Sequence, residues 1–232
     1  DQGEARLTGS VRQRSTDHDP SNRRVVVAPL NEATLATATA ALTEMDPVLA
    51  GLAERNGVPP LWSREPGFAT MLRLILEQQV SLASANAAFR RLEDSMGVVE
   101  PVAFLEFDDA QLRAVGFSRQ KTEYVRAFAA GLIEGSIDID LPVDLSDDDA
   151  IERLTAIRGV GPWTAACYLL FALRRPDVWP PGDRALEVSV GRVYGFPQPA
   201  SAHEAGERAL RWRPFRAVAA RMLWHEYLGG RA

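Results

Sequence analysis

A short glycine-rich turn is the first segment whose residue types are suited to binding chemistry. Gly159 and Gly161 flank Val160, and Pro162 suits the first position of a following helix. Glycines permit positive φ and close approach of another backbone, and the free N–H groups of a helix N-terminus favour an anion such as phosphate. A plain turn between two helices explains the same spacing, and the spacing alone slightly favours that simpler structure.

One carboxylate, Asp183, ends a loop of tryptophan, two prolines and glycine at residues 179–182. A carboxylate fixed in such a loop can stabilise a developing positive charge and orient or deprotonate a water molecule. Aspartate after glycine and before a helix is also a common N-cap, and the residues alone favour the cap. The two roles are compatible, because capping fixes the position of the carboxylate.

Composition excludes several classes of function. The chain has 232 residues, a net charge of −5 and one cysteine, Cys167, which excludes an internal disulfide framework, a cysteine-ligated zinc site and an iron–sulfur cluster. The net charge excludes a globally basic nucleic-acid binder but leaves room for a local basic face. Lys121 is the only lysine among 26 basic residues, which we attribute to genome composition. No apolar run approaches the roughly 20 residues of a membrane span.

The pattern of apolar residues predicts an all-α fold of about eight to ten helices. Residues 1–30 are polar and predict a disordered tail, and residues 31–232 form the helical domain. The expected helices cover 32–43, 47–54, 68 to about 78, 81–96, 108–115, 119–134, 147 to about 156 and 162 to about 174, with further helices after Asp183, Ser201 and Pro214. The expected N-caps and helix-ending glycines are Asp46, Ser118, Ser201, Gly97, Gly116 and Gly135.

Four segments in this order resemble the helix-hairpin-helix DNA glycosylase superfamily, and within it the bacterial 3-methyladenine DNA glycosylase II branch of alkylation repair. They are the helix break at 75–81, the Gly-Phe-Ser-x-x-Lys turn at 116–121, the hairpin at 154–165 with its loop to Asp183, and the C-terminal segment 212–216 with Trp224. The likeness covers about residues 46–228. It implies a two-lobed helical bundle, a hairpin motif at about 147–175 and an active-site cleft between the lobes.

The resemblance implies a monofunctional DNA glycosylase that hydrolyses the N-glycosidic bond of alkylated bases in duplex DNA during base excision repair. Substrates of the 3-methyladenine and 7-methylguanine type are expected, with Asp183 as the catalytic residue. Trp163 stands where endonuclease-III-like members carry a lysine that forms a Schiff base. Tryptophan cannot do so, and we therefore expect water to be the nucleophile and an abasic site to be the product.

The same resemblance assigns residues to the base pocket and to DNA. The expected pocket residues are Trp163, Trp224, Tyr168 and Cys167, with core packing on the last helix as an equal alternative for Trp224. Cys167 departs from the tyrosine usual in the branch. Trp62 and Phe171 are further pocket candidates, although helical spacing favours core packing for Phe171. Gln79 is the expected wedge that fills the gap left by a flipped base, with a solvated loop as the alternative. The expected DNA-binding residues are Gln79, Ser81, Gly159, Val160, Gly161 and Thr164.

No cofactor is expected. As in family members, the main-chain carbonyls of Thr155, Ile157 and Val160 are candidates to hold a structural monovalent cation. Arg158 replaces a proline usual in the hairpin, which reduces the rigidity of the turn. A C-terminal arginine cluster is equally consistent with phosphate contacts and with a solvated helix face; its members are Arg208, Arg211, Arg213, Arg216 and Arg221.

Double-stranded DNA is the expected partner, with no membrane association and a monomeric chain. The expected location is the bacterial cytoplasm, in association with the nucleoid. Two other hypotheses stay open. One is an enzyme of the same fold that acts on deaminated or oxidised bases, and the other is a non-catalytic helix-hairpin-helix protein that only binds DNA.

Overall fold

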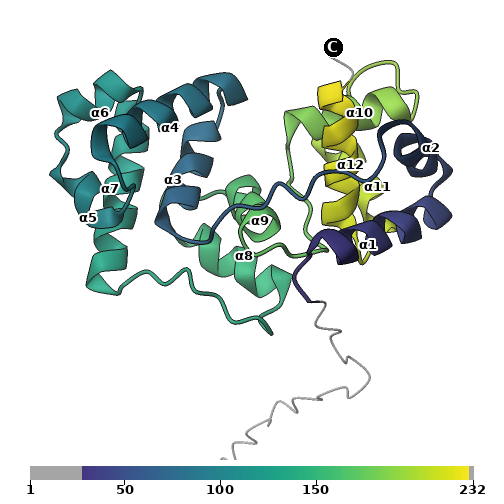
Figure 1. Ribbon diagram of the computed structural model, residues 1–232, viewed down its shortest axis with the longest axis horizontal. Coiled ribbons are helices and arrows are strands. Elements are labelled where there is room, and N and C mark those ends of the chain that lie inside the picture. The colour runs from purple at the N-terminus through teal and green to yellow at the C-terminus, as the bar shows by residue number, and fades with distance from the viewer. Residues whose placement is uncertain (1–27, 230–232) are drawn as a thin grey trace, which may run out of the picture.

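The computed structural model describes residues 28–229, and within this range helices are the only regular secondary structure (Figure 1). The first half contains α1 (Glu32–Met45), α2 (Pro47–Asn56), α3 (Phe68–Glu77), α4 (Leu82–Met96), α5 (Pro101–Glu106) and α6 (Asp109–Val115). The second half contains α7 (Arg119–Glu134), α8 (Asp147–Thr155), α9 (Pro162–Phe171), α10 (Arg184–Val193), α11 (Ala202–Ala209), the 3₁₀-helix η1 (Leu210–Trp212) and α12 (Arg216–Gly229). The predicted all-α class is confirmed.

Local capping explains where most helices begin and end. The side chains of Asp46, Ser118 and Ser201 accept N–H groups of the first turns of α2, α7 and α11, as predicted. Gly116 and Gly135 end α6 and α7 in the left-handed conformation. Helix α5 is absent from the sequence-based expectation, because six residues are too short to show a helical period.

Several boundaries differ from the prediction, and α1 and α2 each end two residues later than expected, at Met45 and Asn56. Helix α9 ends at Phe171 rather than near residue 174, and Arg174 adopts a positive φ of 53° that a helix cannot contain. Helix α12 begins at Arg216 rather than Pro214. Leu30 is buried and its N–H donates to the Arg174 carbonyl at 2.8 Å, so this residue belongs to the packed fold rather than to a tail. The rest of the predicted tail, residues 1–27, lies outside the described residues.

The helices form two lobes, as expected from the resemblance. Helices α3–α7 make one lobe, and α1, α2 and α10–α12 make the other (Figure 1). Helices α8 and α9 lie between them, and residues 57–67 cross from α2 to α3 along the molecule (Figure 1). No helix in the described part of the chain is long and apolar enough to span a membrane.

A buried guanidinium joins the crossing segment to both neighbouring helices. Arg221 on α12 is fully buried and donates hydrogen bonds to the carbonyls of Leu61, Leu170 and Ala217 at 2.7–3.0 Å. Burial lowers the pKa of Arg221 to about 10. Three carbonyl acceptors stabilise the charge in place of a carboxylate, which holds residue 61, α9 and α12 in a fixed relation.

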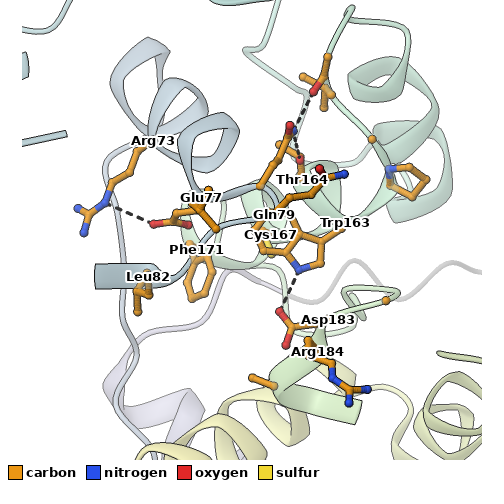
Figure 2. Close-up of a pocket in the computed structure, with 18 of the residues that line it drawn as sticks. Arg73, Glu77, Gln79, Leu82, Trp163, Thr164, Cys167, Phe171, Asp183 and Arg184 are labelled. Atoms are coloured by element: carbon orange, nitrogen blue, oxygen red, sulfur yellow. Dashed lines mark hydrogen bonds and ion pairs between the residues drawn. The ribbon is translucent and has the colours of Figure 1, made fainter. Parts of the chain in front are cut away.

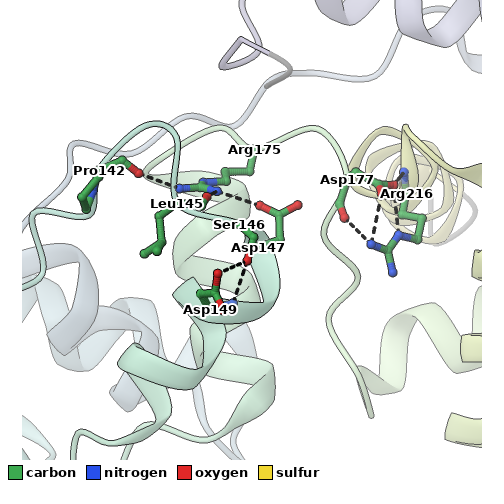
Figure 3. A network of polar contacts seen from close by, with 8 residues as sticks. All are labelled: Pro142, Leu145, Ser146, Asp147, Asp149, Arg175, Asp177 and Arg216. Atoms are coloured by element: carbon green, nitrogen blue, oxygen red, sulfur yellow. Dashed lines mark hydrogen bonds and ion pairs between the residues drawn. The ribbon is translucent and has the colours of Figure 1, made fainter. Parts of the chain in front are cut away.

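Two more arginines fix the start of α8 and the start of α12 (Figure 3). Arg175 donates to the carbonyls of Leu145 and Pro142 and pairs with Asp147 at 3.0 Å. Arg216 pairs with Asp177 at 2.9 Å and also donates to its carbonyl. These contacts anchor the loops on either side of the hairpin helices.

A second buried network involves Asp46, the N-cap of α2. Tyr194 and Trp212 donate to its Oδ2 at 2.6 and 3.0 Å, and the Val48 N–H donates to its Oδ1 at 2.9 Å. Burial by itself raises the pKa of Asp46, but the hydrogen bonds from Tyr194, Trp212 and the backbone outweigh burial and lower it. The ionised carboxylate therefore stabilises the fold.

We expect Asp46→Asn to lower the free energy of unfolding by about 1.5–3 kcal/mol at pH 7, the contribution of hydrogen bonds to a charged group. Because the folded-state pKa lies below the ordinary value of 3.8, this stabilisation is present above that value and is lost as the pH falls through the folded pKa. Urea unfolding of both proteins measures the difference. A difference that already narrows between pH 7 and pH 5 would contradict this assignment.

Candidate active site

A long groove of about 1890 Å³ runs along the α3–α4 turn, the α8–α9 hairpin, the loop before α10 and the end of α12. It is larger than the roughly 300–1,000 Å³ of a small-molecule pocket, which suits a segment of a polymer. The residues predicted to bind DNA all line it: Gln79, Ser81, Gly159, Val160, Gly161 and Thr164. Five basic and two acidic side chains face the groove, and so the acidic chain has a local basic surface here.

Asp183 is the N-cap of α10 and also receives two indole N–H groups. Its Oδ1 accepts the Leu186 N–H at 2.9 Å and the Trp224 Nε1–H at 3.1 Å, and its Oδ2 accepts the Trp163 Nε1–H at 2.9 Å (Figure 2). The carboxylate is partly exposed to the groove. Three donors from three helices fix its orientation, and it acts as cap and groove carboxylate together.

The aromatic wall of the groove includes Phe171. This ring stacks on Trp224 with centroids 5.4 Å apart, and the Arg64 guanidinium lies 4.9 Å over the Phe171 ring. Phe171 packs against the hydrophobic core, as favoured, and it also lines the groove, so both interpretations hold for this residue. Trp62 also lines the groove, with a positive φ of 48° and its ring edge against His225.

Cys167 and Tyr168 have different positions although they are neighbours in sequence. Cys167 is buried at the groove, and burial, followed by the charge of Asp183, raises the pKa of its thiol well above the ordinary value. The thiol therefore keeps its proton. Tyr168 does not line the groove: it is fully buried, and its hydroxyl accepts the Gly67 N–H at 3.0 Å. The expected pocket position of Tyr168 is wrong, because helix α9 turns this side chain toward the start of α3.

An ion-pair cluster beside the pocket has no counterpart among the expected site residues. Arg64 donates to both oxygens of Glu77 at 2.8 and 3.3 Å, and Arg73 Nε lies 3.5 Å from Glu77 Oε1. Figure 2 places Glu77 between Arg73 and Phe171. The sequence carries no signal for this cluster, since Arg64 lies outside α3 and no motif links it to Glu77.

The hairpin turn requires glycine at one position and leaves space at the other. Gly159 has a φ of +89°, and a Cβ there would lie 2.4 Å from Tyr124 Cγ. Gly161, the N-cap of α9, has a φ of −91°, and a methyl group added at its Cα would enter open space. No side chain caps α9, so the N–H groups of its first turn can bind an anion. Arg158 is exposed, lines the groove and lies 3.6 Å from Glu123.

The α3–α4 turn, residues 78–81, is attached to the hairpin by Gln78, a residue that sequence reasoning missed. Its Nε2 donates to the Gly159 carbonyl and to Thr164 Oγ1, both at 2.9 Å. Gln79 follows with a positive φ of 57° and an exposed side chain, and Ser81 caps α4. Hydrogen bonds of Gln78 thus join the two elements that are predicted to contact DNA.

The C-terminal arginines do not form one surface. Arg221 is buried, Arg216 pairs with Asp177, and the Arg208 guanidinium lies 4.2 Å over the Tyr194 ring. None of the cluster lines the groove. Arg211 and Arg213 are exposed away from the groove, and for these two residues both alternatives stay open.

The carbonyls expected from the resemblance to hold a monovalent cation lie in the hairpin turn. The Ile157 carbonyl accepts the Val160 N–H at 3.0 Å and keeps a second lone pair, and Thr155 ends α8 in the same turn. No group of three or more histidine, cysteine or acidic side chains in the described range is arranged to hold a metal ion. Neutral carbonyl oxygens fit a weakly bound monovalent ion better than a divalent one.

A two-lobed helical fold that places a glycine hairpin and a capped aspartate on one groove defines the helix-hairpin-helix class. The chain belongs to the HhH-GPD superfamily of base excision DNA repair proteins, whose family model matches residues 72–214. The predicted membership is confirmed.

Known relatives agree with this membership. DNA-3-methyladenine glycosylase 1 of Schizosaccharomyces pombe is 30% identical over 165 residues, covering 69% of this chain and 72% of the relative. A putative DNA-3-methyladenine glycosylase of Bacillus subtilis is 26% identical over 184 residues, and the match spans 76% of this chain but 64% of the relative. The solved S. pombe 3-methyladenine DNA glycosylase in complex with abasic DNA has a TM-score of 0.70 at 26% identity, covering 81% of this chain and 95% of that one.

The two hairpin glycines give a matched pair of variants. We expect Gly159→Ala to lower stability by about 1–3 kcal/mol, because alanine meets Tyr124 and must adopt a positive φ. Gly161→Ala should keep the melting temperature but weaken binding to an abasic-site duplex about tenfold, as one lost charge-assisted hydrogen bond would. Differential scanning fluorimetry and fluorescence anisotropy measure the two effects. Unchanged binding by Gly161→Ala would show that no phosphate approaches this turn.

Proposed function

We propose that the protein is a monofunctional DNA glycosylase that hydrolyses the N-glycosidic bond of alkylated bases in double-stranded DNA. The observation that carries this proposal is the Asp183 carboxylate, held by the Trp163 and Trp224 N–H groups on a groove with the hairpin. The names of the relatives reported above support bases of the 3-methyladenine type, and the sequence resemblance extends this expectation to bases of the 7-methylguanine type.

The reaction needs a carboxylate close to the sugar. The bond from C1′ to the base nitrogen breaks, its electron pair leaves with the base, and positive charge develops on the sugar. Asp183 stabilises that charge, and water then adds to C1′ and loses its proton through the carboxylate to solvent. An alkylated purine is cationic before cleavage and leaves as a neutral base, and it therefore needs no acid to protonate it.

The other groups at the groove favour such a cationic substrate. Glu77, the second acidic side chain there, is already paired with Arg64 and Arg73. Among the described residues that line the groove there is no histidine, and the thiol of Cys167 holds its proton. A neutral lesion would lack a strong proton donor. The aromatic face of Trp163 suits cation–π contact with an alkylated base.

The monofunctional chemistry, hydrolysis without strand cleavage, follows from the lack of a free amine at the site. Trp163 carries no amine, and the Lys121 Nζ is bound to two backbone carbonyls at 2.7 and 2.8 Å. The described residues at the groove therefore offer no free amine that could form a Schiff base with the sugar, and the expected product is an intact strand with an abasic site.

DNA contacts in this proposal come from the hairpin and the α3–α4 turn. The α9 N-terminus holds a phosphate, Gln79 fills the gap left by the flipped base, and the Thr155, Ile157 and Val160 carbonyls hold a monovalent cation. A monomer is sufficient, since one chain supplies the whole groove. We further propose that the protein acts in the bacterial cytoplasm in association with the nucleoid, as expected above.

A second candidate is the same reaction on deaminated or oxidised bases. Cys167 favours it, because a small side chain replaces the larger tyrosine of the branch and changes the shape of the pocket. A binding-only role predicts DNA affinity without base release, and a panel of damaged duplexes separates the three possibilities.

The decisive test is base release from methylated duplex DNA by the wild type and by Asp183→Asn. We expect the variant to lose about 100- to 1,000-fold in single-turnover rate, as for removal of a key electrostatic group. Strands should stay uncut until alkali is added. Asp109→Asn, at an exposed position on α6, is the matched control. DNA binding without base release by the wild type on every damaged duplex would leave only the binding role.

The two indoles can be tested separately. Trp163→Phe and Trp224→Phe each keep an aromatic ring but remove an N–H that orients Asp183. Each should slow base release about tenfold or more, the cost of one hydrogen bond to a charged group. Equal rates in wild type and both variants would show that the orientation of Asp183 does not depend on these donors.

A further inference from the structure

The only lysine of the chain lies beneath the turn that carries Gln79. Lys121 is on the first turn of α7, and its Nζ donates to the carbonyls of Leu76 at 2.7 Å and Gln78 at 2.8 Å. These carbonyls lie at the C-terminal end of α3, where the helix dipole favours a cation. The ammonium therefore binds the backbone directly before Gln79.

The backbone at this point needs such support. Gln79 has a φ of 57° without being glycine, a conformation that costs energy and persists only where the surroundings hold it. Gln78 fixes the turn from the hairpin side through Gly159 and Thr164, and Lys121 fixes it from the α7 side. The side chain of Gln79 itself is exposed and lines the groove.

The presence of lysine rather than arginine at position 121 is informative in this chain. Every other basic position is arginine, so composition alone would place arginine here as well. An ammonium is compact and directs its hydrogens tetrahedrally, which suits two carbonyls of one turn, whereas a planar guanidinium is larger and fits carboxylates and phosphates. Burial lowers the pKa of Lys121, in agreement with an ammonium enclosed by protein.

We propose that Lys121 is a positioning residue for DNA: it sets the α3–α4 turn so that Gln79 enters the gap left by the flipped base. This inference rests on the proposed glycosylase function. Lys121 acts through Gln79 and contacts neither the base nor the sugar. The sequence motif that contains it accordingly serves the turn rather than the chemistry.

A double-mutant cycle tests the proposal. Lys121→Met, Gln79→Ala and the double variant are compared in single-turnover base release from methylated duplex DNA. A displaced positioning group costs up to about 100-fold, and we expect a loss of about tenfold for Lys121→Met in the wild-type background. No further loss is expected when Gln79 is already alanine. A loss of the same size in both backgrounds, or no loss in either, overturns the proposal.

A fluorescent base supplies a readout that a general loss of stability would not move. With 2-aminopurine opposite an abasic-site analogue, insertion of Gln79 changes the emission, and Lys121→Met should reduce this change as Gln79→Ala does. Arg119→Met is the control. Arg119 lies two residues before Lys121, carries the same charge, and has an exposed side chain that pairs with Glu123. An unchanged signal in Lys121→Met overturns the positioning role.

Lys121→Arg separates geometry from charge and also covers the case in which Lys121→Met does not fold. The proposal expects Lys121→Arg to lose activity and fluorescence response, with affinity for undamaged duplex unchanged. Wild-type behaviour of Lys121→Arg would mean that charge alone suffices, and weakened binding to undamaged duplex would mean a direct phosphate contact. Either result overturns the proposal. If the wild type released no base, the proposed function would fail instead, whatever the Lys121 variants did.

Discussion

The rest of the site depends on one carboxylate that receives N–H groups from three helices. Asp183 caps α10, and the indoles that hold it come from α9 and α12, which meet at the boundary between the lobes. A buried or half-buried carboxylate requires donors, and here the donors are also the walls of the groove. The group proposed for catalysis is therefore part of the packing between hairpin and C-terminal helix, so that chemistry and architecture share the same hydrogen bonds.

The acidic net charge of the chain is compatible with a DNA-binding groove because binding in this proposal does not depend on free basic side chains. Arg221, Arg216 and Arg208 make internal contacts away from the groove. Those at the groove also have protein partners, such as Glu77 for Arg64 and Glu187 for Arg184. Binding in this proposal relies on backbone N–H groups and the α9 dipole more than on free cations, which implies a shallow dependence of affinity on salt.

Sequence reasoning was sufficient where the determinants are local. The hairpin at Gly159, the cap at Asp183 and the ends of α6 and α7 follow from residue types a few positions apart. It failed where contacts join distant segments. Nothing near Tyr168 indicates that its hydroxyl meets Gly67, and nothing near Arg221 indicates that three carbonyls surround it. Residue roles taken from the resemblance remain predictions, although the geometry brings most of those residues to one groove.

The Arg221 contacts restrict how far the walls of the groove can separate. Since one guanidinium holds the crossing segment at Leu61, the end of α9 at Leu170 and the body of α12, the walls carried by these segments cannot separate without exposing an unpaired charge. Two hydrogen bonds of Gln78 also join the α3–α4 turn to the hairpin. These contacts favour a groove whose shape exists before DNA binds, so that in the proposed function the deformation needed for binding falls on the duplex. Lesions that soften base stacking would then be selected by the ease with which the DNA bends, before any base enters the pocket.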